Sequence, residues 1–225
     1  MILSHKKRYL QIALNSSLEE ARLIIQSIPI SDRIILEAGT PLIKTYGIQA
    51  ISNLNFWWAQ RTSGGEMPPY IAADLKTMDR AGTEVSIAKN AGASAAICLG
   101  QAPIETLNSF IEDCQKNNID SMVDMMNIEY PINVLRKLKE PPDVVLLHRG
   151  VDEEKFNKNK PIPYIQINKI LSAYNVLISI AGGDTIREVQ RAIFNGANIV
   201  VMWKEFYHSN ELTGKLAEDF LREIK

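Results

Sequence analysis

Residues 70–100, YIAADLKTMDRAGTEVSIAKNAGASAAICLG, contain two short apolar runs on either side of an amphipathic stretch. The runs YIAADL (70–75) and SAAICL (94–99) are almost continuously apolar, which is typical of strands buried on both faces in a parallel sheet. The stretch between them, TEVSIAKNAGA (83–93), has the pattern of a helix, and Gly92 supplies a stop signal. This part of the sequence therefore predicts one strand–helix–strand unit.

The same unit repeats along the whole chain, which gives eight predicted strands. The turn after the first strand, NSSLEE, lacks the glycines that a doubly wound open sheet usually carries there. The pattern therefore predicts an α/β fold, a (β/α)8 TIM barrel in one domain over residues 1–225. The six other predicted strands are YLQIAL (9–14), RIILEA (33–38), DSMVDM (120–125), DVVLLH (143–148), NVLISI (175–180) and NIVVMW (198–203).

Between the strands lie amphipathic stretches with helix signals. SSLEEARLIIQSI (16–28) has a capping residue in Ser17 and a glutamate three residues later, the spacing of a capping box. Two polar stretches, 53–70 and 149–163, are the longest predicted loops, and either could cover a site. The remaining predicted helices are IETLNSFIEDCQKNN (104–118), TIREVQRAIFNGA (185–197) and NELTGKLAEDFLREI (210–224).

The composition excludes several classes of protein. The chain has 225 residues, 46% of them hydrophobic and 23% charged, and its net charge is −1. This balance argues against a basic nucleic-acid-binding protein or one held on an anionic membrane. Cys98 and Cys114 lack the spacing of a zinc site, and no signal peptide or membrane-spanning segment is apparent. We expect a cytoplasmic protein.

Acidic residues occupy the ends of two adjacent predicted strands. Glu37 ends the second strand and Asp74 ends the third. In a barrel the active site forms at the carboxyl ends of the strands, so these carboxylates could meet there. Two oxygen ligands with open positions suit Mg²⁺ or Mn²⁺. A structural ion pair with Lys76 is an equally good interpretation of the pattern.

Two further strand ends carry groups suited to chemistry. Gly182 and Gly183 precede a helix start, an arrangement that can bind phosphate, although it also serves plain turns. Asp184 is expected to cap that helix. His148, at the end of the sixth strand, is either a structural residue or a general acid or base.

Four motifs carry a resemblance to a known family: LEAGTPLIKTYG (36–47), ADLKTMD (73–79), HRGVDEE (148–154) and AGG (181–183). In this order and spacing the sequence resembles the orotidine monophosphate decarboxylase superfamily and, within it, the 3-hexulose-6-phosphate synthases. The resemblance implies a barrel of the ribulose-phosphate-binding type. It also implies a homodimer with shared active sites and a sugar-phosphate substrate.

The resemblance assigns a role to each matching residue. It implies an aldolase, or carbon–carbon lyase, that joins ribulose 5-phosphate to formaldehyde through an enediolate. Lys76 would contact substrate oxygens, Asp79 would reach the partner's site, and His148 would move the proton at C1. The implied Mg²⁺ ligands are Glu37 and Asp74, Asp74 being counted as catalytic too, and the implied substrate-binding residues are Asn15, Glu37, Arg149, Gly182, Gly183 and Lys204.

Single positions bear on the choice within the superfamily. Glu37 stands where orotidine phosphate decarboxylation needs a lysine, and Val151 stands where keto-gulonate-phosphate decarboxylases carry an arginine. Asn15 replaces the usual aspartate, and Trp203-Lys204 replaces the Gly-Arg or Gly-Gly of the phosphate turn. Two alternatives stay open. One is a relative with enediolate or decarboxylase chemistry on a different, differently anchored substrate; the other is a non-catalytic binding barrel.

Overall fold

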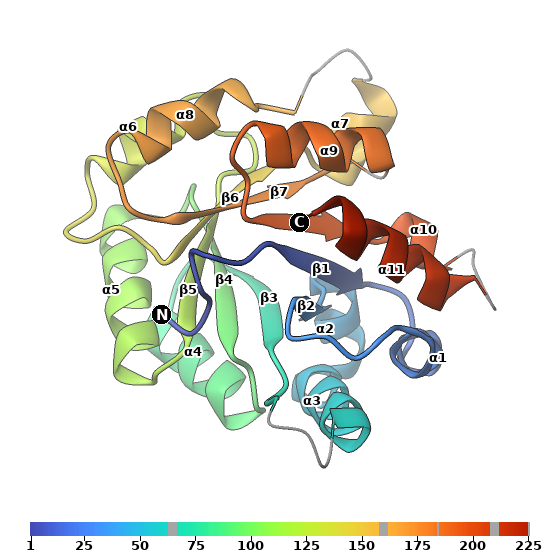
Figure 1. Ribbon diagram of the computed structural model, residues 1–225. Helices are drawn as coiled ribbons and strands as arrows, with labels where there is room; N and C mark the ends of the chain where they lie inside the picture. Colours follow the sequence, from blue (N-terminus) through green and yellow to red (C-terminus); the bar gives the residue numbers. More distant parts are fainter. Residues whose placement is uncertain (63–66, 158–161, 184, 208–211, 225) are drawn as a thin grey trace.

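The eight predicted strands form a closed parallel barrel. The computed structural model describes residues 1–62, 67–157, 162–183, 185–207 and 212–224. Each strand pairs with the next one along the chain, and the eighth pairs with the first, as in Leu10 opposite Val200. The TIM barrel is therefore confirmed (Figure 1). The strands are β1 (Tyr9–Leu14), β2 (Ile34–Ala38), β3 (Ile71–Thr77), β4 (Ala95–Leu99), β5 (Asp120–Asp124), β6 (Val144–His148), β7 (Leu177–Ala181) and β8 (Ile199–Met202).

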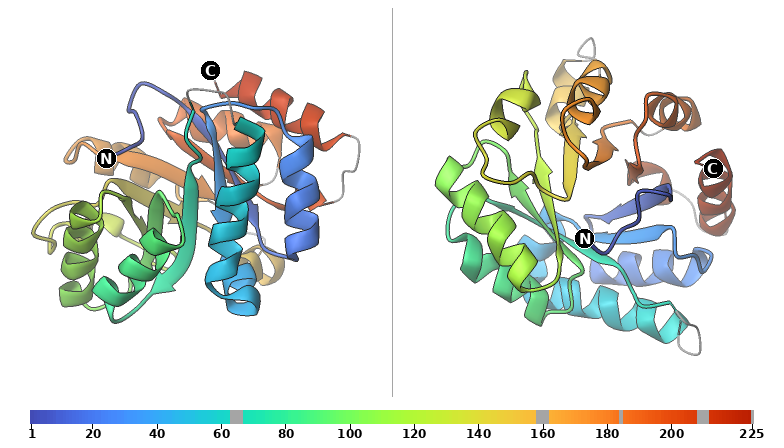
Figure 2. Two further views of the ribbon diagram at one scale, coloured as in Figure 1. Left: turned by 90° about the horizontal axis from the view of Figure 1, so that it is seen from below. Right: turned by 60° about the vertical axis from the view of Figure 1, so that its left-hand side comes forward.

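Helices surround the outside of the barrel (Figure 2). Ser17 caps the first of them as predicted, because its Oγ accepts a hydrogen bond from the Glu20 amide at 3.2 Å. None of the helices in the described ranges has the length and apolar character that crossing a bilayer requires. The helices are α1 (Leu18–Ser27), α2 (Thr40–Tyr46), α3 (Ile48–Thr62), α4 (Ala81–Asn90), α5 (Ile104–Lys116), α6 (Pro131–Leu135), α7 (Val151–Phe156), α8 (Ile165–Leu171), α9 (Ile186–Phe194), α10 (Lys204–Tyr207) and α11 (Thr213–Glu223).

The first predicted loop, 53–70, is wrong for most of its length. Helix α3 runs through it to Thr62, and residues 63–66 lie outside the described ranges. Ile51, Leu54 and Trp58 are fully or almost fully buried, at the spacing of one helix face. Polar residues between these positions interrupt the apolar run, which hid the helical period in the sequence.

The second predicted loop, 149–163, is wrong over its first half. Helix α7 occupies Val151–Phe156, and residues 158–161 lie outside the described ranges. Acidic residues fill its first turn, where they interact favourably with the helix dipole. None of its residues is buried, so the stretch carries no apolar period that could have revealed the helix.

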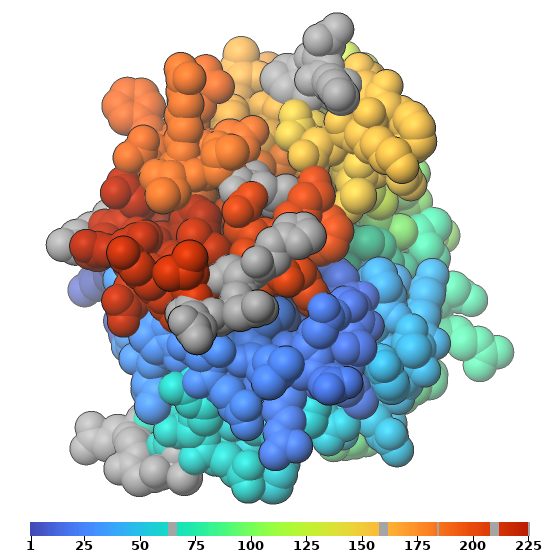
Figure 3. Space-filling view, turned by 90° about the vertical axis from the view of Figure 1, so that its right-hand side faces the viewer, coloured from blue at the N-terminus to red at the C-terminus, as the bar shows by residue number. Residues whose placement is uncertain are grey.

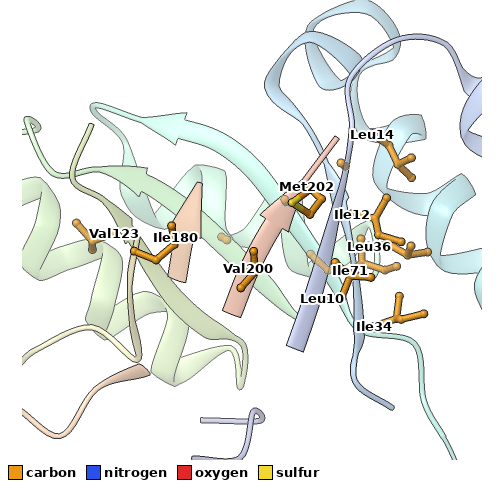
Figure 4. Close-up of a cluster of buried hydrophobic side chains, with 14 of the residues drawn as sticks. Leu10, Ile12, Leu14, Ile34, Leu36, Ile71, Val123, Ile180, Val200 and Met202 are labelled. Atoms are coloured by element: carbon orange, nitrogen blue, oxygen red, sulfur yellow. The ribbon is translucent and has the colours of Figure 1, made fainter. Parts of the chain in front are cut away.

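Strand residues alternate between two separate cores. Leu10, Ile12 and Leu14 of β1 pack in a large cluster with residues of other strands (Figure 4). The same cluster includes side chains of the surrounding helices. Tyr9 and Ala13, at the intervening positions, belong to clusters formed almost entirely by strand residues inside the barrel. This period of two follows from strand geometry, and it fixes which polar residues can face the barrel interior.

The strand pairing arranges the interior side chains in layers, each contributed by alternate strands, as the tilt of this fold requires. A middle layer comes from β1, β3, β5 and β7, the layer above it from the even strands, and the third again from the odd strands. From the middle upward these layers are Gln11, Ala72, Met122 and Ser179; Glu37, Ile97, Leu146 and Val201; and Ala13, Asp74, Asp124 and Ala181.

Helix α3 offers a matched test of this packing. We expect Trp58→Ala to lower the free energy of unfolding by about 3–5 kcal/mol, because the ring is fully buried. Phe56→Ala removes an exposed ring from the same helix and should change it by less than about 0.5 kcal/mol. Denaturant unfolding of both variants measures the difference. Equal losses would contradict the assigned helix face.

Candidate active site

Five charged or ionisable side chains meet at the carboxyl end of the barrel. Glu37 comes from β2, Asp74 and Lys76 from β3, Asp124 from β5 and His148 from β6. Each follows an interior residue of its strand by two positions, so the alternation that fills the core also turns these groups inward. Figure 3 views this end of the barrel, where the beginning and the last quarter of the chain meet.

A cavity of about 480 Å³ opens at this end of the barrel. Four of the five groups border it directly, while Asp124 lies behind Lys76 and His148, which it contacts, and is completely buried. One wall is apolar and includes Leu146, Val201 and Trp203. The cavity therefore joins a charged region to an apolar wall, as ligand sites commonly do.

Asp124 connects the two cationic groups. Its Oδ2 lies 2.9 Å from Lys76 Nζ and 2.8 Å from His148 Nδ1. Its Oδ1 accepts a hydrogen bond from the Met126 amide at 2.9 Å. Burial raises the pKa of Asp124, but His148 and Lys76 outweigh it and lower the pKa to about 2. Asp124 is therefore ionised throughout the physiological range.

His148 is held by this carboxylate. Burial lowers its pKa, but the charge and hydrogen bond of Asp124 outweigh that effect, so the pKa is raised above its ordinary value. Because Nδ1 faces Asp124, Nε2 is the ring nitrogen left for a ligand in the cavity. The arrangement makes the imidazole a stronger base and fixes its orientation.

Lys76 stands between two carboxylates in an unusual backbone conformation. Its φ is 46°, and the pairing of β3 with β4 is irregular between Ala73 and Thr77. Its Nζ lies 3.1 Å from Asp74 Oδ2 and contacts Asp124 as well. Burial lowers the pKa of Lys76, but the two carboxylates more than offset this and raise it. Such strained positions are common at functional sites.

Glu37 and Asp74 form the part of the site that could hold a metal. The pKa of Glu37 is raised to about 7, because the carboxyl is buried and lies near the charge of Asp74. Gln11 Nε2 donates a hydrogen bond to Glu37 Oε2, and Thr40 Oγ1 donates to Asp74 Oδ2 at 2.8 Å. A cation would relieve the repulsion between the two carboxylates.

This donor set fits Mg²⁺. The described residues hold no cluster of three or more histidine, cysteine, aspartate or glutamate ligands. Mg²⁺ is usually bound by one or two carboxylates, with water and substrate oxygens in the other positions. The pair Glu37 and Asp74 beside an open cavity matches that requirement.

The model of the orotidine 5'-phosphate decarboxylase / HUMPS family matches residues 8–211 of this chain. The chain belongs to this family. It is 35% identical over 219 residues to the bifunctional enzyme Fae/Hps of Methanocella arvoryzae, a match that covers 96% of the chain and 53% of the relative. The chain thus spans about half the length of the curated relatives it matches.

Solved structures support the same family. The 3-hexulose-6-phosphate synthase of Salmonella typhimurium has the same fold, with a TM-score of 0.82 at 23% identity over 96% of this chain and 98% of that one. Another 3-hexulose-6-phosphate synthase structure has a TM-score of 0.76 at 27% identity. That match covers 96% of this chain and all of the other.

Three of the remaining predicted site residues line the cavity, and two do not. Asn15, Arg149 and Gly182 line it, and Arg149 Nη2 donates a hydrogen bond to the Gly182 carbonyl at 2.7 Å. Gly183 is buried and does not line the cavity. Asp79 is exposed outside the cavity.

Two further residues singled out in the sequence are Lys204, an implied substrate-binding residue, and Asp184, a predicted helix cap. Lys204 forms an ion pair with Glu154 at 2.8 Å, and Glu154 itself lines the cavity. Asp184, the predicted cap of α9, lies outside the described residues, and Thr185 caps this helix with a hydrogen bond from the Glu188 amide.

Sequence reasoning missed the residues that hold the predicted ones in place. Asp124 lies at the end of a predicted strand, as Glu37 and Asp74 do, but no role is predicted for it from the sequence. Gln11 and Thr40 gave no signal, because a single amide or hydroxyl near a strand is common. Their roles depend on contacts between β1 and β2 and between α2 and β3.

The link between Asp124 and His148 can be tested by titration. Since the carboxylate raises the pKa of His148, we expect the isosteric Asp124→Asn to lower it. Histidine NMR titration of wild type and variant measures the change. Asp32→Asn removes an exposed carboxylate paired with Lys7 and is the control, with no change expected. An unaltered His148 pKa in Asp124→Asn would contradict this electrostatic assignment.

Proposed function

We propose that this chain is a Mg²⁺-dependent aldolase of the 3-hexulose-6-phosphate synthase type, which joins ribulose 5-phosphate to formaldehyde and catalyses the reverse cleavage. The observation that carries the proposal is the convergence of His148, Asp124 and Lys76 beside Glu37 and Asp74 on one cavity. The similarity to Fae/Hps over 96% of the chain supports it.

His148 is placed to act as the base. Its Nε2 would take the proton from C1 of ribulose 5-phosphate, leaving the electron pair in an enediolate that attacks the carbon of formaldehyde. The new alkoxide would then take a proton from the imidazolium, which would return His148 to its basic form. Asp124 holds the ring through Nδ1 and stabilises the imidazolium that forms.

Lys76 and the carboxylate pair are suited to the charge that develops on the substrate. The ammonium of Lys76 would lie close to the substrate oxygens, where fixed positive charge stabilises an enediolate. Mg²⁺ held by Glu37 and Asp74 would supply Lewis-acid stabilisation of the same oxygens. Thr40 keeps the Asp74 carboxylate in position.

The substrate phosphate would bind at the opposite side of the cavity, among Arg149, Gly182 and Gly183, with Lys204 nearby. The resemblance to the 3-hexulose-6-phosphate synthases is our basis for proposing a homodimer with shared sites. In that dimer Asp79, which is exposed here, would reach the partner's cavity. We further propose that the protein works in the cytoplasm.

A second candidate is a family member with enediolate chemistry on a differently anchored substrate. Trp203 lines the cavity at the end of β8 and packs against Ala13 and Leu146, which narrows the space for a phosphate. Lys204, the nearby cation that could bind a phosphate, already forms an ion pair with Glu154. A panel of sugar phosphates would separate this candidate from the first.

The first experiment is the consumption of ribulose 5-phosphate with formaldehyde, in Mg²⁺ and in chelator. We expect turnover with Mg²⁺ and its loss with chelator. Glu37→Gln and Asp74→Asn should fold normally and lose the response to Mg²⁺, because each removes a ligand charge. Mg²⁺ binding without turnover would favour the second candidate, and global unfolding of both variants would mean that the carboxylates are structural.

Proton exchange isolates the role of His148. We expect His148→Asn to slow exchange of the C1 proton of ribulose 5-phosphate with deuterium oxide by about 10²–10⁴-fold, the usual contribution of a general base. Mg²⁺ affinity, measured by calorimetry, should stay close to wild type, because the ring is not a proposed ligand. Exchange at the wild-type rate would remove His148 from the mechanism.

A further inference from the structure

Two buried polar atoms lie inside the barrel below the proposed metal ligands. Gln11 and Ser179 are each 1% exposed. Gln11 Oε1 and Ser179 Oγ have no hydrogen-bond partner within the described part of the chain. Buried polar atoms are nearly always hydrogen-bonded to protein or to ordered water. We therefore expect a hydrogen-bond donor beside Gln11 Oε1 and a hydrogen-bonding partner beside Ser179 Oγ.

The orientation of Gln11 is determined by Glu37. Its Nε2 donates to Glu37 Oε2, and the flipped amide would set a carbonyl oxygen against a carboxylate oxygen. Gln11 Oε1 is thus turned away from Glu37. An acceptor in that position requires a donor from the barrel interior.

The strand pairing brings Ser179 to the same layer. Gln11 on β1 and Ser179 on β7 are adjacent members of the middle layer, whose other members are Ala72 and Met122. Neither alanine nor methionine carries a donor, so the Ser179 hydroxyl is the donor that this layer's side chains offer. Ala72, the layer's smallest side chain, fills less of the interior than the methionine opposite Gln11 in this layer.

We propose that one water molecule binds inside the barrel between Ser179 Oγ and Gln11 Oε1, and that Gln11 and Ser179 together position the Glu37 carboxylate. The hydroxyl donates to the water, the water donates to Gln11 Oε1, and Gln11 Nε2 donates to Glu37. Each of these three hydrogen bonds thus joins a donor to an acceptor. The positioning role rests on the proposed function, in which Glu37 binds Mg²⁺, and both residues act through Glu37 without touching the metal.

Ser179→Ala tests the proposed chain of hydrogen bonds, because an unpartnered hydroxyl and a water-binding hydroxyl predict different effects on stability and on Mg²⁺ affinity. A hydroxyl without a partner destabilises the fold, so its removal would leave stability unchanged or raise it. A hydroxyl that holds the water supports Glu37, so its removal should lower Mg²⁺ affinity by about tenfold, the lower end of the effect of residues that orient metal ligands. Isothermal titration with Mg²⁺ alone measures the affinity, and thermal unfolding measures the stability.

Further variants separate positioning from general damage. Gln11→Met keeps the approximate side-chain volume and removes both the carbonyl oxygen and the NH2 group of the amide. We therefore expect a larger loss of Mg²⁺ affinity, about 10–100-fold. Ser179→Thr restores a hydroxyl and should recover most of the affinity. The matched control is Ser121→Ala, since the buried Ser121 hydroxyl bonds to Asp143 at 2.9 Å, away from Glu37. It should lower the unfolding temperature without changing Mg²⁺ affinity.

Crystal structures of the metal-free wild type and of Ser179→Ala test the water site independently of catalysis. We expect one ordered water between Ser179 and Gln11 in the wild type and its loss in the variant. Absence of this water, or unchanged Mg²⁺ affinity in Ser179→Ala, would overturn the proposal. If wild type holds the water but binds no Mg²⁺, the proposed function and the positioning role fail while the hydration site stands.

Discussion

The alternation of strand side chains in a closed barrel is the constraint on which the rest of this structure depends. Once the odd-numbered residues of β1 face inward, the pairing around the barrel determines which residues of the remaining seven strands also face inward. Leu10 and Ile12 then pack against helices, while Gln11 and Ala13 face the interior. A shift of one residue in β2 would turn Glu37 outward and dismantle the site together with the core.

Within that frame, one buried carboxylate organises the electrostatics. Burying an unpaired charge is costly, and the buried charge of Asp124 is stabilised by its contacts with Lys76 and His148. Its contact with His148 raises the pKa of the imidazole, and both contacts lower the pKa of Asp124. Glu37, buried but lacking such cationic contacts of its own, has its pKa moved the opposite way, to about 7.

The sequence predicted what depends on local pattern. All eight strands appear within two residues of the predicted bounds, because apolar runs flanked by turns are a local signal. Helix α3 escaped prediction because its buried face is spaced among polar residues. Asp124, Gln11 and Thr40 escaped because their roles are contacts across strands or between a strand and a helix. No local pattern distinguishes a carboxylate that holds a lysine and a histidine from one that only ends a strand.

The charge of the assembled site bears on the proposed metal. Glu37, Asp74 and Asp124 contribute three negative charges when ionised, Lys76 contributes one positive charge, and His148 adds a second only when protonated. The five groups thus carry a net charge of about −2 while the imidazole is ready to act as a base. Asp124 and Asp74 share the ammonium of Lys76, and Glu37 forms no such ion pair among the described residues, so the uncompensated negative charge lies at the Glu37 and Asp74 pair. A bound divalent cation would restore neutrality at this pair, which ties the basic form of His148 to an occupied metal site.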